Sequence, residues 1–507
     1  MAGILGLNGF NKSDGTNKLL AVAGTYVFEL SGSAWVNKGS VLTANKNAEF
    51  ANFLDYAFMV NGYDGDAMRS YDGTNWSIST LVNDAPKGNY IHLFGRRLCV
   101  GYVSYFNQTF PSRVWYSDIA KPDDTLVWGR EDNTDLITTA GRSVVTSNSS
   151  KFMERGIKVG DTFVITSGTN QGTYAVSNVL SETQLDLVTG APYAGTDQGV
   201  LATSSSQSFW CGSNYIDVKT DDGDVIKGLG DNSGRLLIFK RNSLHRWGGT
   251  GEAEEVKGSP GTPSHRSIVN LKNIPITMFL SANPVGIFAY DGVKSTNITR
   301  GIQDYLDGIS AANLDTAVGW RVGDLYKVYV GTITNTDKDI SIPNAVIVYN
   351  AAGDSLWFES LTHVPQVTTE FVESSATNLY FGNDSVNAYQ LEYGTQDSTT
   401  NYSWYVETGA IFPSGSELNK VFEGVEVVVQ RGFGTSVQYK IVGDEKGSDD
   451  PQWKSIGQLT NNLSSLSISD SPKGRGIRFR FSREPITEPI ILEKINIYYK
   501  VIGNPFI

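Results

Sequence analysis

The chain has 507 residues, too many for one hydrophobic core, so we expect two to four domains. Hydrophobic residues make up 40% of it, which argues against global disorder. The net charge of −12 argues against an outer surface that grips phosphate backbones, because such surfaces are basic. The 53 glycines and the many Trp, Tyr and Phe residues are typical of short strands joined by tight turns.

Three features of the sequence bear on the cell compartment. Residues Met1–Gly6 contain no basic region followed by a long apolar run, so we expect no signal peptide. No apolar stretch is long enough to predict a transmembrane helix. Cys99 and Cys211 form no CxxC motif; one disulfide is possible, but buried free thiols are the preferred interpretation. We therefore expect folding in a reducing cytoplasm.

A loose repeat runs through about the first 400 residues. Each copy has an alternating apolar and polar strand, a turn with Gly, Asn or Asp, and a second strand that ends in an aromatic residue. The spacing of roughly 40 residues suits a four-stranded propeller blade. The candidate units, about seven in number, are 19–40, 48–79, 88–129, 206–249, 264–310, 314–360 and 363–394. A β-sandwich array remains an alternative, because no WD or kelch signature is present.

A long interruption separates the third and fourth units. We interpret residues 131–204 as a small inserted β domain, because an unstructured loop of this length would be unusual. Three strands are predicted within 160–187, and residues 149–157 could form a short helix.

At least five further strands are predicted after residue 399, which suits a C-terminal β-sandwich of jelly-roll or immunoglobulin type. The predicted fold class is all-β: a β-propeller-like repeat array with an inserted small β domain and a C-terminal β-sandwich. The predicted domains are 1–130 and 205–398 for the propeller, 131–204 for the insert and 399–507 for the sandwich.

Signals for catalysis are weak. No HxH, HxxxH or HExxH spacing, GxSxG elbow or phosphate-binding GxxxxGK[ST] loop is present; the four histidines are His92, His245, His265 and His363. A propeller-type glycosidase would need two carboxylates that face one cleft, and the many turn Asp residues single out no pair. We therefore expect no enzymatic activity and no cofactor.

The acidic segment with Asp221, Asp222 and Asp224 is the remaining candidate metal site. Acidic loops punctuated by Gly can hold calcium through oxygen ligands, but this segment lacks the downstream Glu of the EF-hand pattern. Asp-Gly pairs form turns more often than they bind metal, so a turn is the preferred interpretation.

Two other residue sets suggest contacts. Arg475, Arg478 and Arg480 belong to the only local basic run, and Arg478 and Arg480 would share one face of a strand. We expect them to contact an acidic neighbour subunit rather than nucleic acid, because the run is short and the chain is acidic. Aromatic residues recur near the ends of the repeat units, which favours blade packing over sugar stacking; they are Trp35, Trp76, Trp115, Trp247 and Trp357.

Two segments resemble proteins of tailed bacteriophages. GDTFVITSGTNQGTYAVSNVLSETQLDL (160–187) looks like a small β module of tailed-phage structural proteins. GRLLIFKRNSLHRW (234–247), with the YDG turns, is similar to propeller-type phage tail proteins, which include the tail-nozzle and packaged-DNA-stabilisation proteins of short-tailed phages. The shared pattern consists of apolar residues and turns, so no catalytic residue is carried over.

The resemblance implies a non-enzymatic virion structural protein in the tail, at the nozzle or head–tail region, assembled in the host cytoplasm. Such proteins form rings, commonly homo-hexamers, that continue the DNA channel and anchor tail appendages. The implied partners are further copies of the chain, tail adaptor and fibre proteins, and passing DNA without specific binding; no membrane insertion is implied. The alternatives are a glycan- or receptor-binding phage fibre or adhesin, and a propeller-fold polysaccharide hydrolase.

Overall fold

The computed structural model describes residues 3–503 except for 33, 40–41, 78–84, 106–107, 120–129, 154–156, 158, 189–202, 213, 339, 374–375, 386, 392–395, 398–399, 402–403, 416–417, 432–433, 444–451 and 484–490. The chain divides into two compact units, Met1–Leu391 and Glu392–Ile507. The division falls seven residues before the predicted boundary at 398. The fold is mostly β, as predicted.

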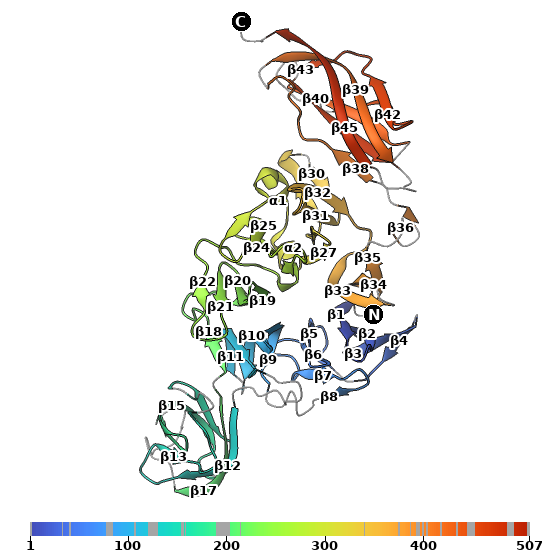
Figure 1. Cartoon of the computed structure of the whole chain (residues 1–507). Coiled ribbons are helices and arrows are strands. Elements are labelled where there is room, and N and C mark those ends of the chain that lie inside the picture. Colours follow the sequence, from blue (N-terminus) through green and yellow to red (C-terminus); the bar gives the residue numbers. More distant parts are fainter. Residues whose placement is uncertain are drawn as a thin grey trace. The chain divides into compact units, whose positions relative to one another are not determined.

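Seven antiparallel sheets form a propeller in the described part of the first unit (Figure 1). Six of the sheets have four strands and the last has three, in agreement with the seven predicted units. Blades 1 and 2 contain β1 (Ile4–Asn11), β2 (Asn17–Ala23), β3 (Tyr26–Ser31), β4 (Ala34–Asn37), and β5 (Glu49–Phe53), β6 (Tyr56–Val60), β7 (Arg69–Tyr71), β8 (Trp76–Ser77). Blades 3 and 4 contain β9 (Lys87–Phe94), β10 (Arg97–Tyr105), β11 (Gln108–Tyr116), β18 (Tyr215–Asp217), and β19 (Ile226–Asn232), β20 (Arg235–Lys240), β21 (Leu244–Trp247), β22 (Glu254–Glu255).

The remaining blades carry the few helices of the first unit. Blade 5 contains β23 (Val269–Asn270), β24 (Thr277–Ala282), β25 (Val285–Tyr290) and β26 (Ser295–Asn297). Blade 6 contains β27 (Val318–Val322), β28 (Leu325–Tyr329), β31 (Ala345–Asn350) and β32 (Ser355–Ser360), and blade 7 contains β33 (Pro365–Glu373), β34 (Ala376–Asn383) and β35 (Ala388–Leu391). The short helices α1 (Gln303–Leu306) and α2 (Ala311–Asp315) connect blades 5 and 6, and the hairpin of β29 (Ile333–Asn335) and β30 (Ile340–Ile342) is inserted into blade 6.

The first strands of the seven blades form a closed ring. Each contacts the next in the order β1, β5, β9, β19, β23, β27 and β33, and β33 contacts β1. Figure 1 shows blade 7 beside blade 1 at this closing point. In the described residues no blade combines strands from the two ends of the propeller segment. Blades 1 and 7 therefore meet by side-by-side packing and not by sharing a sheet.

A glycine permits this closing contact. The Gly9 amide in β1 donates to Thr369 Oγ1 in β33 at 2.9 Å. A Cβ atom on Gly9 would lie only 2.0 Å from the carbonyl oxygen of Glu370, so only glycine allows the two backbones to come this close.

The recurring tryptophans pack between blades, which confirms the prediction made for them. Trp115 and Trp247 are buried, and the other three, Trp35, Trp76 and Trp357, are partly buried against cores that include residues of neighbouring blades. The cysteine prediction is also confirmed, because Cys99 and Cys211 are buried thiols that are not joined in a disulfide.

A buried carboxylate joins blades 1 and 2. The Glu29 side chain is 4% exposed and accepts hydrogen bonds from Lys18 Nζ at 2.6 Å and Tyr71 Oη at 2.5 Å, with Lys38 Nζ at 2.9 Å. Burial by itself raises the pKa of Glu29, but these three donors outweigh it and hold the pKa below the usual 4.5. Ionised Glu29 therefore stabilises this inter-blade contact.

Replacing Glu29 with glutamine should lower the free energy of unfolding by about 1–2 kcal/mol at pH 7, because charge-assisted hydrogen bonds are lost. A lowered pKa stabilises the folded state fully above pH 4.5 and loses this effect as the pH falls through the folded-state pKa. Urea unfolding at pH 7 and pH 3 should therefore show a difference that shrinks in acid. Glu252→Gln, at an exposed site, is the matched control, and a Glu29→Gln difference that stays constant with pH would contradict the assignment.

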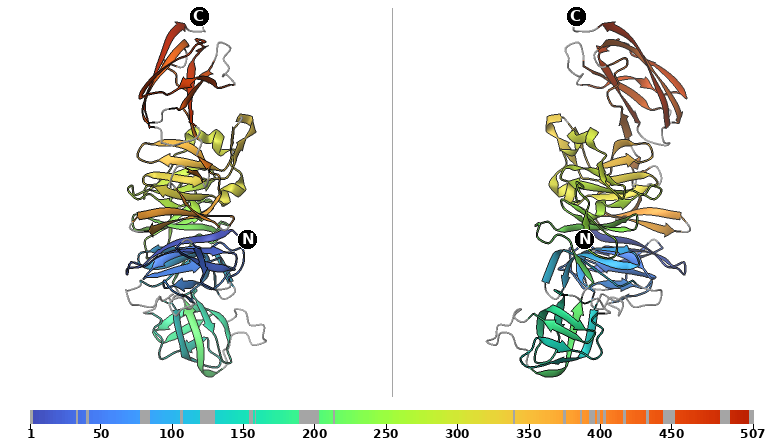
Figure 2. Two further views of the ribbon diagram at one scale, coloured as in Figure 1. Left: turned by 90° about the vertical axis from the view of Figure 1, so that its right-hand side faces the viewer. Right: turned by 60° about the vertical axis from the view of Figure 1, so that its left-hand side comes forward.

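The inserted domain is a closed six-stranded barrel (Figure 2). Its strands are β12 (Arg130–Thr138), β13 (Val144–Thr146), β14 (Thr162–Ile165), β15 (Gly172–Ser181), β16 (Gln184–Leu187) and β17 (Ser204–Gly212). The predicted range 131–204 was too short, because β17 was assigned to the fourth repeat unit. The predicted helix at 149–157 is not found in its described part, where residues 152–153 form a turn; residues 154–156 lie outside the described residues.

The barrel lies between the third and fourth strands of blade 3. β18, just after the barrel, pairs with β11, just before it. Trp210 of β17 stacks on Trp115 of β11 with ring centroids 6.4 Å apart, and Tyr215 of β18 lies 5.4 Å from Trp115. Val164 and Trp210 of the barrel belong to the same buried cluster as blade residues, so the two domains share one continuous core.

The second unit is a two-sheet β-sandwich, as predicted. One sheet has the order β38 (Trp404–Glu407), β44 (Gly476–Arg483), β40 (Ser436–Val442) and β41 (Lys454–Gln458). In the other, β39 (Asn419–Arg431) pairs with β42 (Leu463–Ser467) and β43 (Lys473–Gly474) on one side and with β45 (Ile491–Gly503) on the other. Alternating apolar residues of both sheets form the core, with Phe422 and Val427 facing Tyr439 and Phe479.

Candidate functional site

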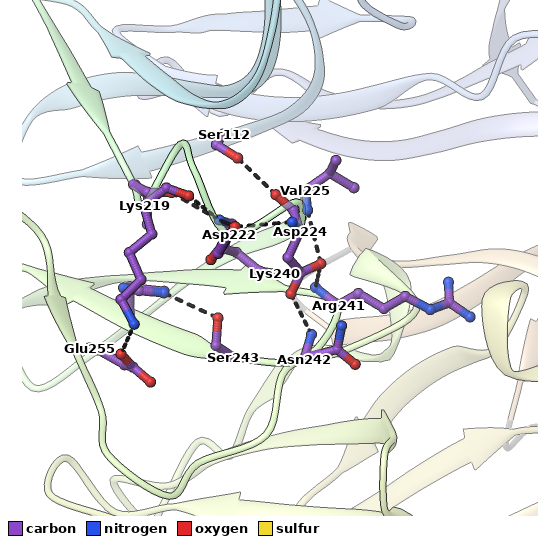
Figure 3. Close-up of polar contacts among 12 residues, drawn as sticks. Ser112, Lys219, Asp222, Asp224, Val225, Lys240, Arg241, Asn242, Ser243 and Glu255 are labelled. Atoms are coloured by element: carbon purple, nitrogen blue, oxygen red, sulfur yellow. Dashed lines mark hydrogen bonds and ion pairs between the residues drawn. The ribbon is translucent and has the colours of Figure 1, made fainter.

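The acidic segment of blade 4 has a structural role. Figure 3 shows Asp222 and Asp224 surrounded by hydrogen-bond donors. Asp222 Oδ1 accepts from Lys240 Nζ at 2.5 Å, and the Asp224 carboxylate accepts from three backbone amides, those of Val225, Arg241 and Asn242, at 2.8–3.1 Å. Asp221 is exposed on the same turn. Because both carboxylates accept hydrogen bonds from donors of the chain itself, the segment has the contacts of a structural turn, and calcium binding stays an untested alternative.

Lys240 explains why Asp222 is held in place. Its side chain is fully buried, and Nζ also donates to the carbonyl oxygens of Val218 at 3.0 Å and Lys219 at 2.7 Å. Burial is the largest single influence and raises the pKa of Asp222, but the bond from Lys240, the bond from the Asp224 amide and the positive charge of Lys240 together outweigh it, so the pKa is lowered overall. The pair ties the acidic turn to β20.

Asp222→Asn should lower the free energy of unfolding by about 1–2 kcal/mol, because the buried ammonium group loses its counter-charge. Millimolar calcium chloride should leave the unfolding midpoint of the unmodified protein unchanged. Thermal melts with and without calcium check both expectations, with the exposed Asp221→Asn as control. A calcium-dependent rise in the midpoint that Asp222→Asn abolishes would restore the metal-site interpretation.

The three predicted interface arginines lie on or beside β44. Arg478 and Arg480 share one face of their strand, as expected, and it is the outer face of the sheet, because the residues that alternate with them, Ile477, Phe479 and Phe481, are buried. Arg480 bonds Glu407 and lies over the Trp453 ring at 4.3 Å.

Arg475 precedes β44 in the chain, and its amide donates to the carbonyl of Val442 at 3.1 Å. A role of the three arginines in contacts with other subunits stays a prediction.

A polar cavity of about 290 Å³ lies on the propeller axis, and sequence reasoning did not identify it. Its lining comes from all seven blades and includes Leu7, Glu49, His92, Gly230, His265, Arg266, Asn270, Gly319 and Thr368. The axis is a common place for propellers to bring distant residues together, because the first strand of every blade reaches it. This cavity is the candidate functional site.

Arg266 is the central residue of the cavity. It lies in the short 3₁₀ turn His265–Ser267 that precedes blade 5. Its Nε donates to Glu49 Oε1 of blade 2 at 2.9 Å, Nη1 donates to the carbonyl of Gln366 of blade 7 at 2.6 Å, and Nη2 donates to the carbonyl of Leu5 of blade 1 at 2.7 Å. One guanidinium group, from the turn before blade 5, therefore bonds to blades 1, 2 and 7.

His265 lies beside this arginine in its neutral form. Its Nδ1 accepts from the Leu229 amide at 3.3 Å, which leaves the proton on Nε2, 4.0 Å from Glu49. Burial lowers the pKa of His265 to about 4, against the opposing effect of Glu49. The ring packs on Tyr90 at 5.1 Å, and burial also raises the pKa of the Tyr90 hydroxyl.

Two further polar links continue around the axis. His92 Nε2 of blade 3 lies 2.9 Å from Asp231 Oδ1 of blade 4, and Asn270 of blade 5 donates to the same oxygen at 3.1 Å. The hydrogen bond with His92, more than the opposing burial, lowers the pKa of Asp231. Arg321 of blade 6 forms a two-pronged pair with Glu370 of blade 7 at 2.7 and 3.0 Å. All of these groups bond across blades and so hold the ring closed, and His92 and Asn270 among them also line the cavity.

The histidine spacing could not predict this arrangement. His92 and His265 are far apart in the sequence, and both line the cavity, whereas His363 stacks on Tyr389 in blade 7 and His245 bonds Ser243 in blade 4. The only available signal was the His265–Arg266 pair, which follows a segment rich in Gly, Pro and Ser between two blade units.

No protein-family model and no curated protein matches the chain. Among solved structures it is similar to a phage phi92 endosialidase (11% identity, 69% of this chain and 51% of that chain, TM-score 0.22). It is also similar to YCF48 bound to D1 peptide (9%, 77% and 93%, TM-score 0.30) and to Kluyveromyces lactis Hsv2 (10%, 71% and 98%, TM-score 0.27). The chain spans about half the length of the endosialidase chain. These are β-propeller proteins, and no specific family emerges. The likeness does not indicate a substrate or partner.

Within the described residues no helix is both long and apolar enough to cross a lipid bilayer.

Proposed function

We propose that this protein is a non-enzymatic structural component of a tailed-phage virion. It forms a ring in the tail, at the nozzle or the head–tail region, continues the DNA channel and anchors tail appendages. Its partners are further copies of the chain, adaptor and fibre proteins, and DNA that passes without specific binding.

The observation that carries the proposal is that the charged side chains near the propeller axis form contacts between blades. Arg266, Glu49, Asp231 and Arg321 are all engaged in contacts between blades, which favours a rigid supporting disc over a site with open catalytic groups. Because Arg266 crosses the axis, a DNA channel would run between the subunits of a ring and not through one propeller.

The two added β domains support the same proposal. The barrel shares its core with blade 3, so packed side chains and not a hinge connect it to the propeller at that contact. The sandwich adds two further sheet faces, which are broad surfaces of the kind that ring contacts use.

Size-exclusion chromatography with light scattering, followed by negative-stain microscopy, tests the proposal. We expect closed rings, of six copies if the resemblance to nozzle proteins holds. A protein that remains monomeric at high concentration and with phage tail components present would contradict the proposal.

One observation favours a second candidate, a glycan-binding protein. The axial cavity presents hydrogen-bonding groups of several blades, including His92, Asn270 and Thr368, in a volume of about 290 Å³. A glycan array with reproducible hits that an Asp231→Asn variant loses would favour this reading, since Asp231 orients His92 and Asn270.

A further inference from the structure

We infer that the outer face of the β38–β44–β40–β41 sheet docks on the acidic propeller unit of a second copy of the chain. This inference rests on the proposed ring and identifies the surface that builds it. The basic face is defined by Lys440, Arg478 and Arg480. All three point away from the sandwich core, because the residues that alternate with them, such as Tyr439 and Phe479, are buried.

The basic face places like charges side by side. In the register of β40 and β44, Lys440 is directly opposite Arg478, an arrangement that destabilises an antiparallel pair. Arg480 is directly opposite Gln438 on one side and Glu407 on the other, and it bonds Glu407. Only one of the three cations therefore has an acidic cross-strand partner within the described residues.

Arg478 carries a second sign of an incomplete contact. Its Nε atom is buried and has no hydrogen-bond partner among the described residues. A buried donor without a partner is costly, and an arginine fork suits a carboxylate in particular. The Arg478 side chain as a whole is half-buried, so an acidic group of another molecule would meet the exposed part of the guanidinium rather than Nε, and it would relieve the repulsion with Lys440.

The charge distribution indicates which molecule supplies that group. The outer face carries Lys440, Arg478 and Arg480 against a single acidic residue of these strands, Glu407. Most of the net charge of −12 comes from residues before Glu392, in the propeller unit. A second copy thus offers a complementary acidic surface. Contact between two different surfaces of identical chains is heterologous, and such contacts form a ring when the rotation from one copy to the next closes.

The test compares two charge reversals in the full-length chain. The double variant Lys440→Glu/Arg478→Glu changes the basic face, and Lys494→Glu/Lys500→Glu makes the same charge change on β45 of the other sheet. Sedimentation velocity at low and high sodium chloride measures assembly. We expect the unmodified protein to assemble, with affinity falling as salt rises, the first variant to assemble at least tenfold more weakly, and the second to assemble as the unmodified protein does.

The outcomes separate the inference from the function on which it rests. If the unmodified protein forms rings and Lys440→Glu/Arg478→Glu forms them equally well, the docking surface is wrong and the ring proposal stands. If no version assembles, the ring proposal fails as well. Duplex DNA binding that the first variant alone loses, with assembly unchanged, would assign the face to phosphate and overturn the inference. If Lys440→Glu/Arg478→Glu is less stable but assembles as before, the basic face packs against other residues of the same chain. That result would also overturn the inference.

Discussion

Replacing Arg266 with methionine should lower the free energy of unfolding of the propeller unit by about 3–5 kcal/mol. Removing one partner of a largely buried ion pair leaves the other charge uncompensated, which is the costly case. Here Glu49 would lose its counter-charge, and the carbonyl groups of Leu5 and Gln366 would lose their donor. Urea unfolding followed by tryptophan fluorescence measures the change, because Trp115 and Trp247 lie in the blade cores.

Two further variants show whether the geometry of Arg266 causes the loss. Arg266→Lys keeps the charge but cannot bond in three directions at once, so it should recover only part of the stability. Arg246→Met removes a more exposed arginine whose pair with Glu254 spans 3.2 Å, and it should cost less than about 1 kcal/mol. An Arg266→Met loss as small as that of Arg246→Met would mean that the axis does not depend on this residue.

Gly9→Ala should cost about 3 kcal/mol or more, because the new methyl group would meet the backbone carbonyl of Glu370 at 2.0 Å. A backbone oxygen cannot rotate away as a side chain can, so β1 and β33 must separate. We also expect faster hydrogen exchange in β1 and β33 than in blades 3 to 5, because the ring would open where its ends meet.

Gly301→Ala is the matched control for this substitution. A Cβ atom on Gly301 meets nothing within 4 Å, so the change should stay within about 0.5 kcal/mol. Equal unfolding curves for Gly9→Ala and Gly301→Ala would show that the contact between blades 1 and 7 is not what closes the propeller.

The blade array could be predicted because its signal is local. Alternating strands such as Tyr26–Ser31 and turns such as Asp291–Gly292 can each be recognised from a few neighbouring residues. The packing of the tryptophans between blades could be predicted as well, because they recur at the same position of the local repeat. The first predicted unit began at residue 19 and therefore missed β1, because the glycines Gly6 and Gly9 in its ILGLNGFN sequence interrupt the strand pattern.

The axial site could not be predicted because it depends on closure. Glu49, Arg266 and Gln366 come from three parts of the chain that meet only when the seventh blade reaches the first. Likewise, nothing near Tyr215–Asp217 shows that these residues complete a blade begun before the barrel. Three residues are too few for a strand pattern, and their partner β11 lies about a hundred positions earlier.

The barrel's two ends have an evolutionary consequence. Trp115 and Tyr215 are opposite each other in paired strands of blade 3, so the chain leaves the blade and returns to it at almost the same place. A gap that narrow can be bridged by a tight turn or by another domain with little effect on the order of the blades. Any substitute must still cover the face of Trp115, which Trp210 covers now. The propeller can therefore exchange this appendage as a cassette, provided that the replacement brings its own aromatic residue to the junction.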